Sequence, residues 1–319
     1  MQFNVFPHDS KFDFMRLRWV SASLSILLLV ASIGAMAVQG FNFALDFTGG
    51  TSVELRFEHP ADVDLVRERL DQAGFEGAQV QTFGSGNDLL VRLQPKEGAA
   101  DAQQDGDTSQ TAEEVVHIVS TPENKATRLS SGYVGPQVGR ELAQNGIYAM
   151  LFVVIGFLAY ISFRFEWKFA VAAILTTMHD VVVVAGWFAV TGHEFDLTVL
   201  AGIMGVMGFS INDTIVVFDR VRENFRGVRA PAREILNSSI NQTLSRTVIT
   251  SFVALLTVLA LYLYGGGSLR GMAESMMIGI VIGTLSSIFV ACPLVMWLGV
   301  SKQDLMPKAR DDSALARRP

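Results

Sequence analysis

The sequence GIMGVMGFSINDTIVVFDRVREN at positions 202–224 decides the fold, because it is apolar enough to cross a membrane and still carries a carboxylate in its middle. A charged side chain at that depth costs at least about 2.5 kcal/mol on insertion scales, so Asp213 is the first candidate for a functional residue. Gly202, Gly205 and Gly208 recur every three residues and clear one helix surface for close packing. The stretch predicts a helical bundle that holds Asp213 away from lipid.

The composition of the whole chain agrees with a protein embedded in a lipid bilayer. Half of its 319 residues are hydrophobic and the mean hydropathy is +0.35, which is too apolar for an ordinary soluble protein. A formal net charge of −6 argues against a nucleic-acid partner. No Cys/His cluster, Walker lysine motif or strand-coupled GxGxxG occurs, so neither a metal nor a nucleotide cofactor is expected.

Six apolar segments are long enough to cross about 30 Å of hydrocarbon as helices. They lie at 19–38, 142–163, 169–190, 197–218, 247–264 and 272–300. The first is predicted to be an uncleaved helix rather than a signal peptide, because its apolar run is long and no small-residue cleavage site follows it. The fold class is therefore a polytopic α-helical membrane protein with one span, a domain, and then five spans.

Residues 39–141 form the predicted domain between the first and second spans. Alternating and helical hydrophobic patterns predict strands at 51–57, 78–83, 88–93 and 125–134, and helices at 61–73 and 109–119. The order β-α-β-β-α-β is typical of a small α+β ferredoxin-like domain. The Gly-, Ala-, Asp- and Gln-rich segment 95–108 is expected to be a mobile insert. Gly49 and Gly50 favour a tight turn with positive φ at the start of the domain.

The distribution of Lys and Arg predicts the orientation in the membrane. Positive charge gathers in 1–18, in the hinge 164–168, in a loop after the fourth span and in the tail 301–319. The positive-inside rule then places both termini in the cytoplasm. Residues 39–141 would lie outside, which is the periplasm in a Gram-negative cell.

Asp213 has two readings on the sequence alone. It is either a buried acid that hydrogen-bonds a neighbouring helix or a proton carrier. A carboxyl group removed from water binds a proton more readily. A proton that moves through the membrane potential releases about 2.3 kcal/mol per 100 mV, and a membrane-embedded acid could take up that energy.

Arg246, at the start of the fifth span, is the candidate partner of Asp213. A polar stripe of Thr243, Arg246 or Thr247, Thr250 and Thr257 recurs at helical spacing and is expected to face the bundle rather than lipid. Protonation of Asp213 would then switch a charge pair on and off. The alternative is that Arg246 is a membrane-surface anchor whose charge reaches the headgroups.

Asp180 follows His179 in the middle of the third span, where two ionisable groups cannot face lipid cheaply. Either a second proton-relay site or a helix–helix hydrogen bond would explain them. Asp219, close to Arg220 and Arg222 at the end of the fourth span, is expected to form an ion pair at the membrane surface. The chain lacks a recognisable pair of catalytic aspartate motifs, so no enzyme activity is predicted.

Four motifs in the expected order resemble the SecD/SecF family of bacterial protein-export membrane proteins, and within it the SecF type. They are LDFTGGT at 45–51, VGPQVGREL at 134–142, MHD at 178–180 and SINDTIVVFDRVREN at 210–224. The last is the most specific, and the similarity extends over nearly the whole chain. The acidic insert at 95–108 departs from the family pattern.

The resemblance implies an inner-membrane protein that pairs with SecD in a pseudo-symmetric bundle like those of resistance–nodulation–division transporters. It implies further partners in the SecYEG channel, YajC and the unfolded polypeptide whose export is driven by the proton-motive force. In that family the fourth-span aspartate and the fifth-span arginine are implicated in proton transport, and here these are Asp213 and Arg246. Asp180 falls on the His-Asp pair of the family.

Two other functions stay open on the sequence. A structural scaffold subunit without proton coupling would tolerate Asp213→Asn but not changes at Gly205 or Gly208. Half of an exporter of small molecules or lipids would need a large outer domain with an apolar cavity, whereas 39–141 is short and not apolar. One carboxylate on six helices also suggests a site that is shared with a partner.

Overall fold

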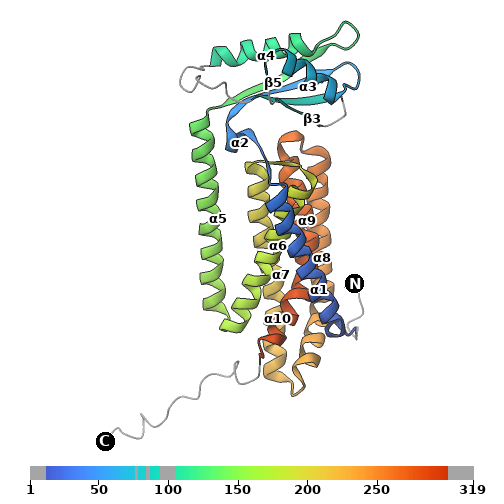
Figure 1. Cartoon of the computed structure of the whole chain (residues 1–319). Helices are drawn as coiled ribbons and strands as arrows, with labels where there is room; N and C mark the ends of the chain where they lie inside the picture. The colour runs from blue at the N-terminus through green and yellow to red at the C-terminus, as the bar shows by residue number, and fades with distance from the viewer. Residues whose placement is uncertain (1–11, 76–77, 84–86, 94–104, 301–319) are drawn as a thin grey trace, which may run out of the picture.

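The structure is a computed structural model that describes residues 12–75, 78–83, 87–93 and 105–300. A bundle of long helices carries a small α/β domain at one end (Figure 1). Within the described residues, six helices are long and apolar enough to cross a membrane, and the predicted fold class is confirmed.

Five of the six membrane helices are longer than the predicted spans, and the last of them, α9, is shorter. Their bounds are α1 Arg18–Val38, α5 Pro136–Arg164, α6 Trp167–Thr191, α7 Leu197–Gly227, α8 Ala232–Tyr264 and α9 Gly267–Ser286. A short 3-10 helix, η1 (Phe14–Leu17), precedes α1. The additional turns lie at the helix ends and contain polar residues, so the apolar runs in the sequence do not include them.

The predicted loop after the fourth span is wrong, because most of it is helical. Helix α7 continues to Gly227 and α8 begins at Ala232, so only 228–231 connect them. The Asn224 side chain donates hydrogen bonds to Ser239 Oγ (2.8 Å) and Gln242 Oε1 (3.1 Å) and fastens the two extensions together. Contacts between the helices therefore stabilise a charge-rich segment that resembles a loop in sequence.

The predicted last span, 272–300, is not one continuous α-helix. Helix α9 gives way to a π-helical turn, η2 (Ser287–Ala291), and then to α10 (Cys292–Trp297). Pro293 lies in the first turn of α10 and has no backbone N–H to continue the α-helical pattern, which gives the break a physical cause. Such π-turns are frequent at functional sites.

Helices α6, α7 and α9 form the interior of the bundle. In their apolar windows 61%, 56% and 56% of residues are buried, against 6%, 11% and 17% in α1, α5 and α8. Helix α7 lies along α9, while α5 stands apart from the others over much of its length (Figure 1). A Cβ atom added at Gly279 on α9 would collide with Val206 on α7, so glycine permits this close packing.

The α/β domain is a four-stranded antiparallel sheet with the spatial order β3-β4-β2-β5. Its elements are β2 Gly50–Phe57, α3 Val63–Gln72, β3 Gln79–Phe83, β4 Asp88–Leu93, α4 Asp105–Val119 and β5 Ala126–Val134. Helices α3 and α4 cover the face turned away from the membrane helices (Figure 1). This is the predicted ferredoxin-like order.

One boundary of the predicted insert 95–108 is wrong, because α4 already begins at Asp105. Gly, Asp and Thr at 106–108 have low helix propensity, which is why the sequence resembled a loop there. Positions 95–104 lie outside the described residues.

A small junction joins the α/β domain to the membrane helices. Strand β1 (Asn42–Phe43) pairs in parallel with β6 (Glu194–Phe195) in the α6–α7 connection, and the one-turn helix α2 (Leu45–Thr48) follows. Gly49 and Gly50 have φ values of +74° and +130°, so the predicted positive φ is confirmed.

Candidate functional site

Asp213 lies in the interior of the bundle, on α7, and is only 4% exposed. Ser287, the first residue of the π-turn, donates a hydrogen bond of 3.2 Å to Asp213 Oδ2. Thr247 on α8 approaches the same carboxyl group, and Arg246 is close enough to interact with it electrostatically. Three helical segments therefore hold one carboxyl group in a place with little water.

Arg246 is close to Asp213 but does not form a direct ion pair with it among the described residues. Its side chain is exposed, as are those of Thr250 and Thr257, whereas Thr243 and Thr247 are buried. The prediction that the whole stripe faces the bundle is therefore wrong for its exposed members. Because α8 is at the edge of the bundle, one of its faces has no neighbour within this chain.

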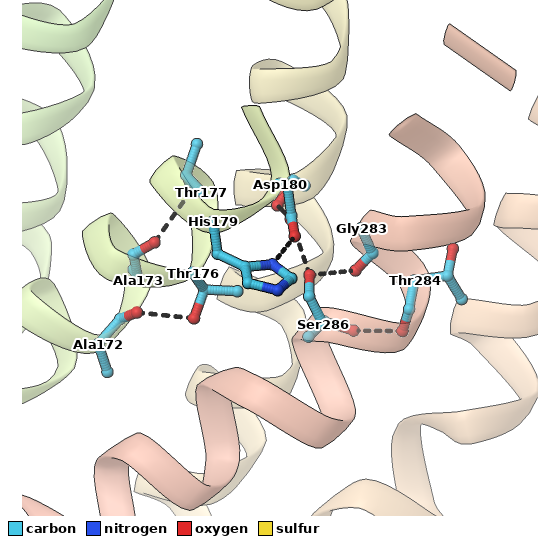
Figure 2. A network of polar contacts seen from close by, with 11 residues as sticks. Ala172, Ala173, Thr176, Thr177, His179, Asp180, Gly283, Thr284 and Ser286 are labelled. Atoms are coloured by element: carbon cyan, nitrogen blue, oxygen red, sulfur yellow. Dashed lines mark hydrogen bonds and ion pairs between the residues drawn. The ribbon is translucent and has the colours of Figure 1, made fainter. Parts of the chain in front are cut away.

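Asp180 lies at the centre of a second polar network, on α6, and is fully buried (Figure 2). Its Oδ2 accepts hydrogen bonds from Ser210 on α7 (2.6 Å) and from Ser286 on α9 (2.7 Å). Its Oδ1 lies 2.9 Å from Nδ1 of His179. Asp180 thus joins three interior helices, and its role as a proton relay stays a prediction.

Two buried polar atoms around the aspartates have no hydrogen-bond partner in the described part of the chain. They are His179 Nε2 and Thr214 Oγ1. Buried polar atoms are usually paired, so unpaired ones close to a carboxyl group suggest that the site is not purely structural.

The two aspartates are held by neighbouring residues. Ser286 binds Asp180 and Ser287 binds Asp213, so both contacts come from the junction between α9 and the π-turn. Neither serine belongs to a motif that marks it as functional in the sequence. Two adjacent hydroxyls within an apolar span indicate a helix contact, but they do not indicate which acid they bind.

The three glycines of α7 have different surroundings. A Cβ atom at Gly202 would collide with Ser275 and approach the Met272 backbone on α9, so this position lies in a close helix contact. Gly205 lies beside the Met276 side chain at an ordinary contact distance. A Cβ atom at Gly208 would meet nothing within 4 Å.

Charged groups gather at the end of the bundle that is opposite the α/β domain. Asp219 forms an ion pair with Arg164 (3.0 Å) on α5 and lies 3.8 Å from Arg222, while Arg220 pairs with Glu223. Across the described ranges, no group of three or more His, Cys, Asp or Glu side chains is arranged to hold a metal ion.

Comparison with known proteins identifies the family. The profile described as "Protein export membrane protein SecD/SecF, C-terminal" matches residues 114–301, and the profile of the "SecD/SecF GG Motif" matches residues 34–61. The protein translocase subunit SecF of Escherichia coli O157:H7 is 43% identical over 298 residues, which cover 92% of this chain and 90% of the relative. The same subunit of Pseudomonas aeruginosa is 43% identical over 94% of this chain and 96% of its own length.

A longer relative has a known structure. The protein translocase subunit SecDF of Thermus thermophilus is 40% identical over 94% of this chain, which matches only 40% of the relative. The crystal structure of SecDF from the same organism superposes with a TM-score of 0.82 and 39% identity, covering 92% of this chain and 39% of that one. By its motifs, its fold and these matches, the chain belongs to the SecD/SecF family of protein-export membrane proteins.

Proposed function

We propose that the chain is a SecF-type subunit that works with SecD and couples proton movement through Asp213 to protein export. The observation that carries this proposal is a carboxyl group that is 4% exposed inside a membrane bundle, with a guanidinium nearby but not paired with it. A salt-bridged or hydrated carboxyl group stays ionised at neutral pH and would not take up protons there. An unpaired, dry acid can bind and release a proton at little cost.

The same groups indicate how a proton could act on the helices. When Asp213 on α7 is ionised, it attracts Arg246 on α8, and this attraction disappears when Asp213 binds a proton. The hydroxyl of Thr247 on α8 lies beside the carboxyl group and can donate a hydrogen bond to it or accept one from it. Each proton cycle would therefore change the force between two helices, which is the coupling step.

The exposed face of α8 supports a partner in the membrane, and SecD is the partner that we propose. A guanidinium and two threonines on that face would meet lipid if the chain were alone, and a charged group in hydrocarbon is costly. The relative from Thermus thermophilus carries the name SecDF and contains a region similar to this chain within a longer protein. We propose SecYEG, YajC and the unfolded polypeptide as further partners of the assembled pair.

The charge distribution supports an inner-membrane location with cytoplasmic termini. The end of α5, the start of α6 and the end of α7 lie at the end of the bundle away from the α/β domain (Figure 1), and they hold Arg164, Lys168, Arg220, Arg222 and Arg226. The positive-inside rule assigns this end to the cytoplasm. Residues 39–141 then belong to the periplasmic side, where exported polypeptide emerges.

The test is proton flux in membrane vesicles that contain this chain and SecD. We expect Asp213→Asn to insert and to copurify with SecD, and to lose proton-dependent flux and export by at least about tenfold, as for a group needed at each cycle. Asp219→Asn is the matched control, because Asp219 lies on the same helix but is 43% exposed at the bundle end. Normal export by Asp213→Asn would overturn the proposal.

A further inference from the structure

We propose that Ser286 and Ser287 are positioning residues that link the protonation of Asp180 to that of Asp213, so that the two acids respond as one unit. The proposal rests on the proposed function and adds to it the route between the two networks. Its basis is that adjacent residues of one helix bind carboxylates from two other helices.

Each serine hydroxyl has two acceptors in reach but only one hydrogen to donate. Ser286 Oγ lies 2.7 Å from Asp180 Oδ2 and 3.1 Å from the Gly283 carbonyl (Figure 2). Ser287 Oγ lies 3.2 Å from Asp213 Oδ2 and 3.0 Å from the Thr284 carbonyl. In each serine, the carboxyl group and a backbone carbonyl of α9 therefore compete for one hydroxyl hydrogen.

The charge of the carboxyl group decides this choice. An ionised carboxylate is the stronger acceptor, so the hydroxyl hydrogen points to it. Once the acid carries a proton, its own O–H can donate to the serine oxygen, and the serine hydrogen turns to the backbone carbonyl. Proton binding thus moves a hydrogen bond from the side chains to the last turn of α9.

The last turn of α9 is suited to pass such a change on. It ends at the π-turn, where the hydrogen-bond pattern of the backbone changes. Thr284, whose carbonyl is the second acceptor of Ser287, also donates to Ser251 on α8 (2.7 Å). Because Ser286 and Ser287 share a peptide unit, a shift of this turn of backbone, caused by new hydrogen bonds to the Gly283 and Thr284 carbonyls, moves both hydroxyls.

Other ionisable groups also face this region and must be considered in any pH experiment. Among the described residues, α6 brings His179 beside Asp180, and α8 brings Arg246 near Asp213. The thiol of Cys292 donates weakly to the Ser287 carbonyl (3.6 Å). The groups that α9 and the π-turn place between the two acids are the uncharged hydroxyls of Ser286 and Ser287.

The experiment measures proton flux against pH in vesicles that contain this chain and SecD. We expect Ser286→Ala and Ser287→Ala each to lower flux about tenfold, as for the loss of a hydrogen bond to a charged group, and to displace the pH of half-maximal flux. Ser287→Thr keeps a hydroxyl and should restore the wild-type pH profile. Ser275→Ala is the matched control, because Ser275 is also buried on α9, donates to the Met272 carbonyl and, among the residues that the structure describes, binds no carboxyl group.

The link itself is tested by combining Asp180→Asn with Ser287→Ala, which alter different networks. If the acids respond as one unit, the double variant loses no more flux than the more severe single variant. Losses that multiply would overturn the link, as would serine variants that match Ser275→Ala. If an alanine variant inserts poorly, Ser287→Cys takes its place, because a thiol has a similar size but donates only a weak hydrogen bond. A wild-type pH profile in Ser287→Cys would also overturn the link.

Asp213→Asn separates this inference from the proposed function. If that variant retains flux, the proposed function fails. If it loses flux while the serine variants behave like Ser275→Ala, only the link between the two acids fails.

Discussion

At the scale of single residues, Gly50 is a position where the backbone itself sets the requirement. Its φ is +130°, and an added Cβ atom would collide with the Leu93 carbonyl. We expect Gly50→Ala to lower the unfolding temperature, through a loss of at least about 1 kcal/mol from backbone strain plus the collision. Gly74→Ala is the control, because Gly74 has φ +90° but open space around it. Equal losses in thermal unfolding of both variants would contradict the role of the collision.

Asp13 gives a residue-scale prediction that depends on pH. It accepts hydrogen bonds from Asn237 and Arg233 at the start of α8, and chiefly the Asn237 bond holds the pKa of Asp13 below its ordinary value of 3.8. A lowered pKa in the folded state means that this stabilisation is complete above 3.8 and disappears as the pH falls through the lowered value. Asp13→Ala should therefore unfold at a lower temperature than the wild type at pH 7. The difference should vanish in strong acid, and a constant difference would contradict the assignment.

The sequence could predict which acids matter but not what holds them. Asp213 and Asp180 stand out because a carboxylate within an apolar helix is costly wherever it points. Their serine partners lie 74 and 106 residues away in the chain, and no local pattern relates such distant positions. The same limit explains why Arg246 was expected to face the bundle. Helical spacing defines a stripe, but only the packing of α8 decides what the stripe faces.

At the scale of helices and strands, prediction was reliable where a single physical cause dominates. About 20 apolar residues must be a membrane helix, so all six spans were found, and β4 has the predicted bounds 88–93. Prediction failed at 219–227, because the apolar run ends there and hydropathy alone does not show that the helix continues in contact with α8. It also failed at the π-turn, because one additional backbone residue hardly changes the hydrophobic pattern.

The extended ends of α7 and α8 give a prediction at this scale. Asn224→Ala removes two hydrogen bonds between them, and a loss of about 1 kcal/mol should raise the population of the opened hairpin about fivefold. Trypsin should then cleave more rapidly at Arg226, which is exposed but within the helix. Glu223→Ala is the control, because within the described residues the ion-pair partner of Glu223 is Arg220 on its own helix and not a residue of α8. Cleavage at the same rate in both variants would show that the hairpin does not depend on Asn224.

At the scale of the whole molecule, the junction connects the α/β domain to the helix that carries Asp213. Arg92 of β4 is 5% exposed and forms an ion pair with Glu194 in the α6–α7 connection. Burial lowers the pKa of Arg92 to about 10, against the opposing influence of Asp196 and Asp46, and it stays charged at neutral pH. Asp196 accepts from Val199 N–H and Asp46 from Leu197 N–H, both at the start of α7. The Arg92 guanidinium of the α/β domain thus lies close to Asp46 and Asp196, whose carboxylates cap the start of α7, the helix that carries Asp213.

This junction predicts that export and proton flux can be separated. Arg92→Gln would leave Asp46, Glu194 and Asp196 facing each other without the guanidinium, and their repulsion should loosen the domain from the start of α7. Export should then fall about tenfold while proton flux in vesicles persists, because the site around Asp213 lies deep in the bundle and is untouched. Arg56→Gln is the matched control, since Arg56 is 57% exposed and pairs with Asp88 inside the sheet. If flux and export fall together in Arg92→Gln, the arginine supports the membrane bundle as a whole, and the domain does not receive its motion through this contact.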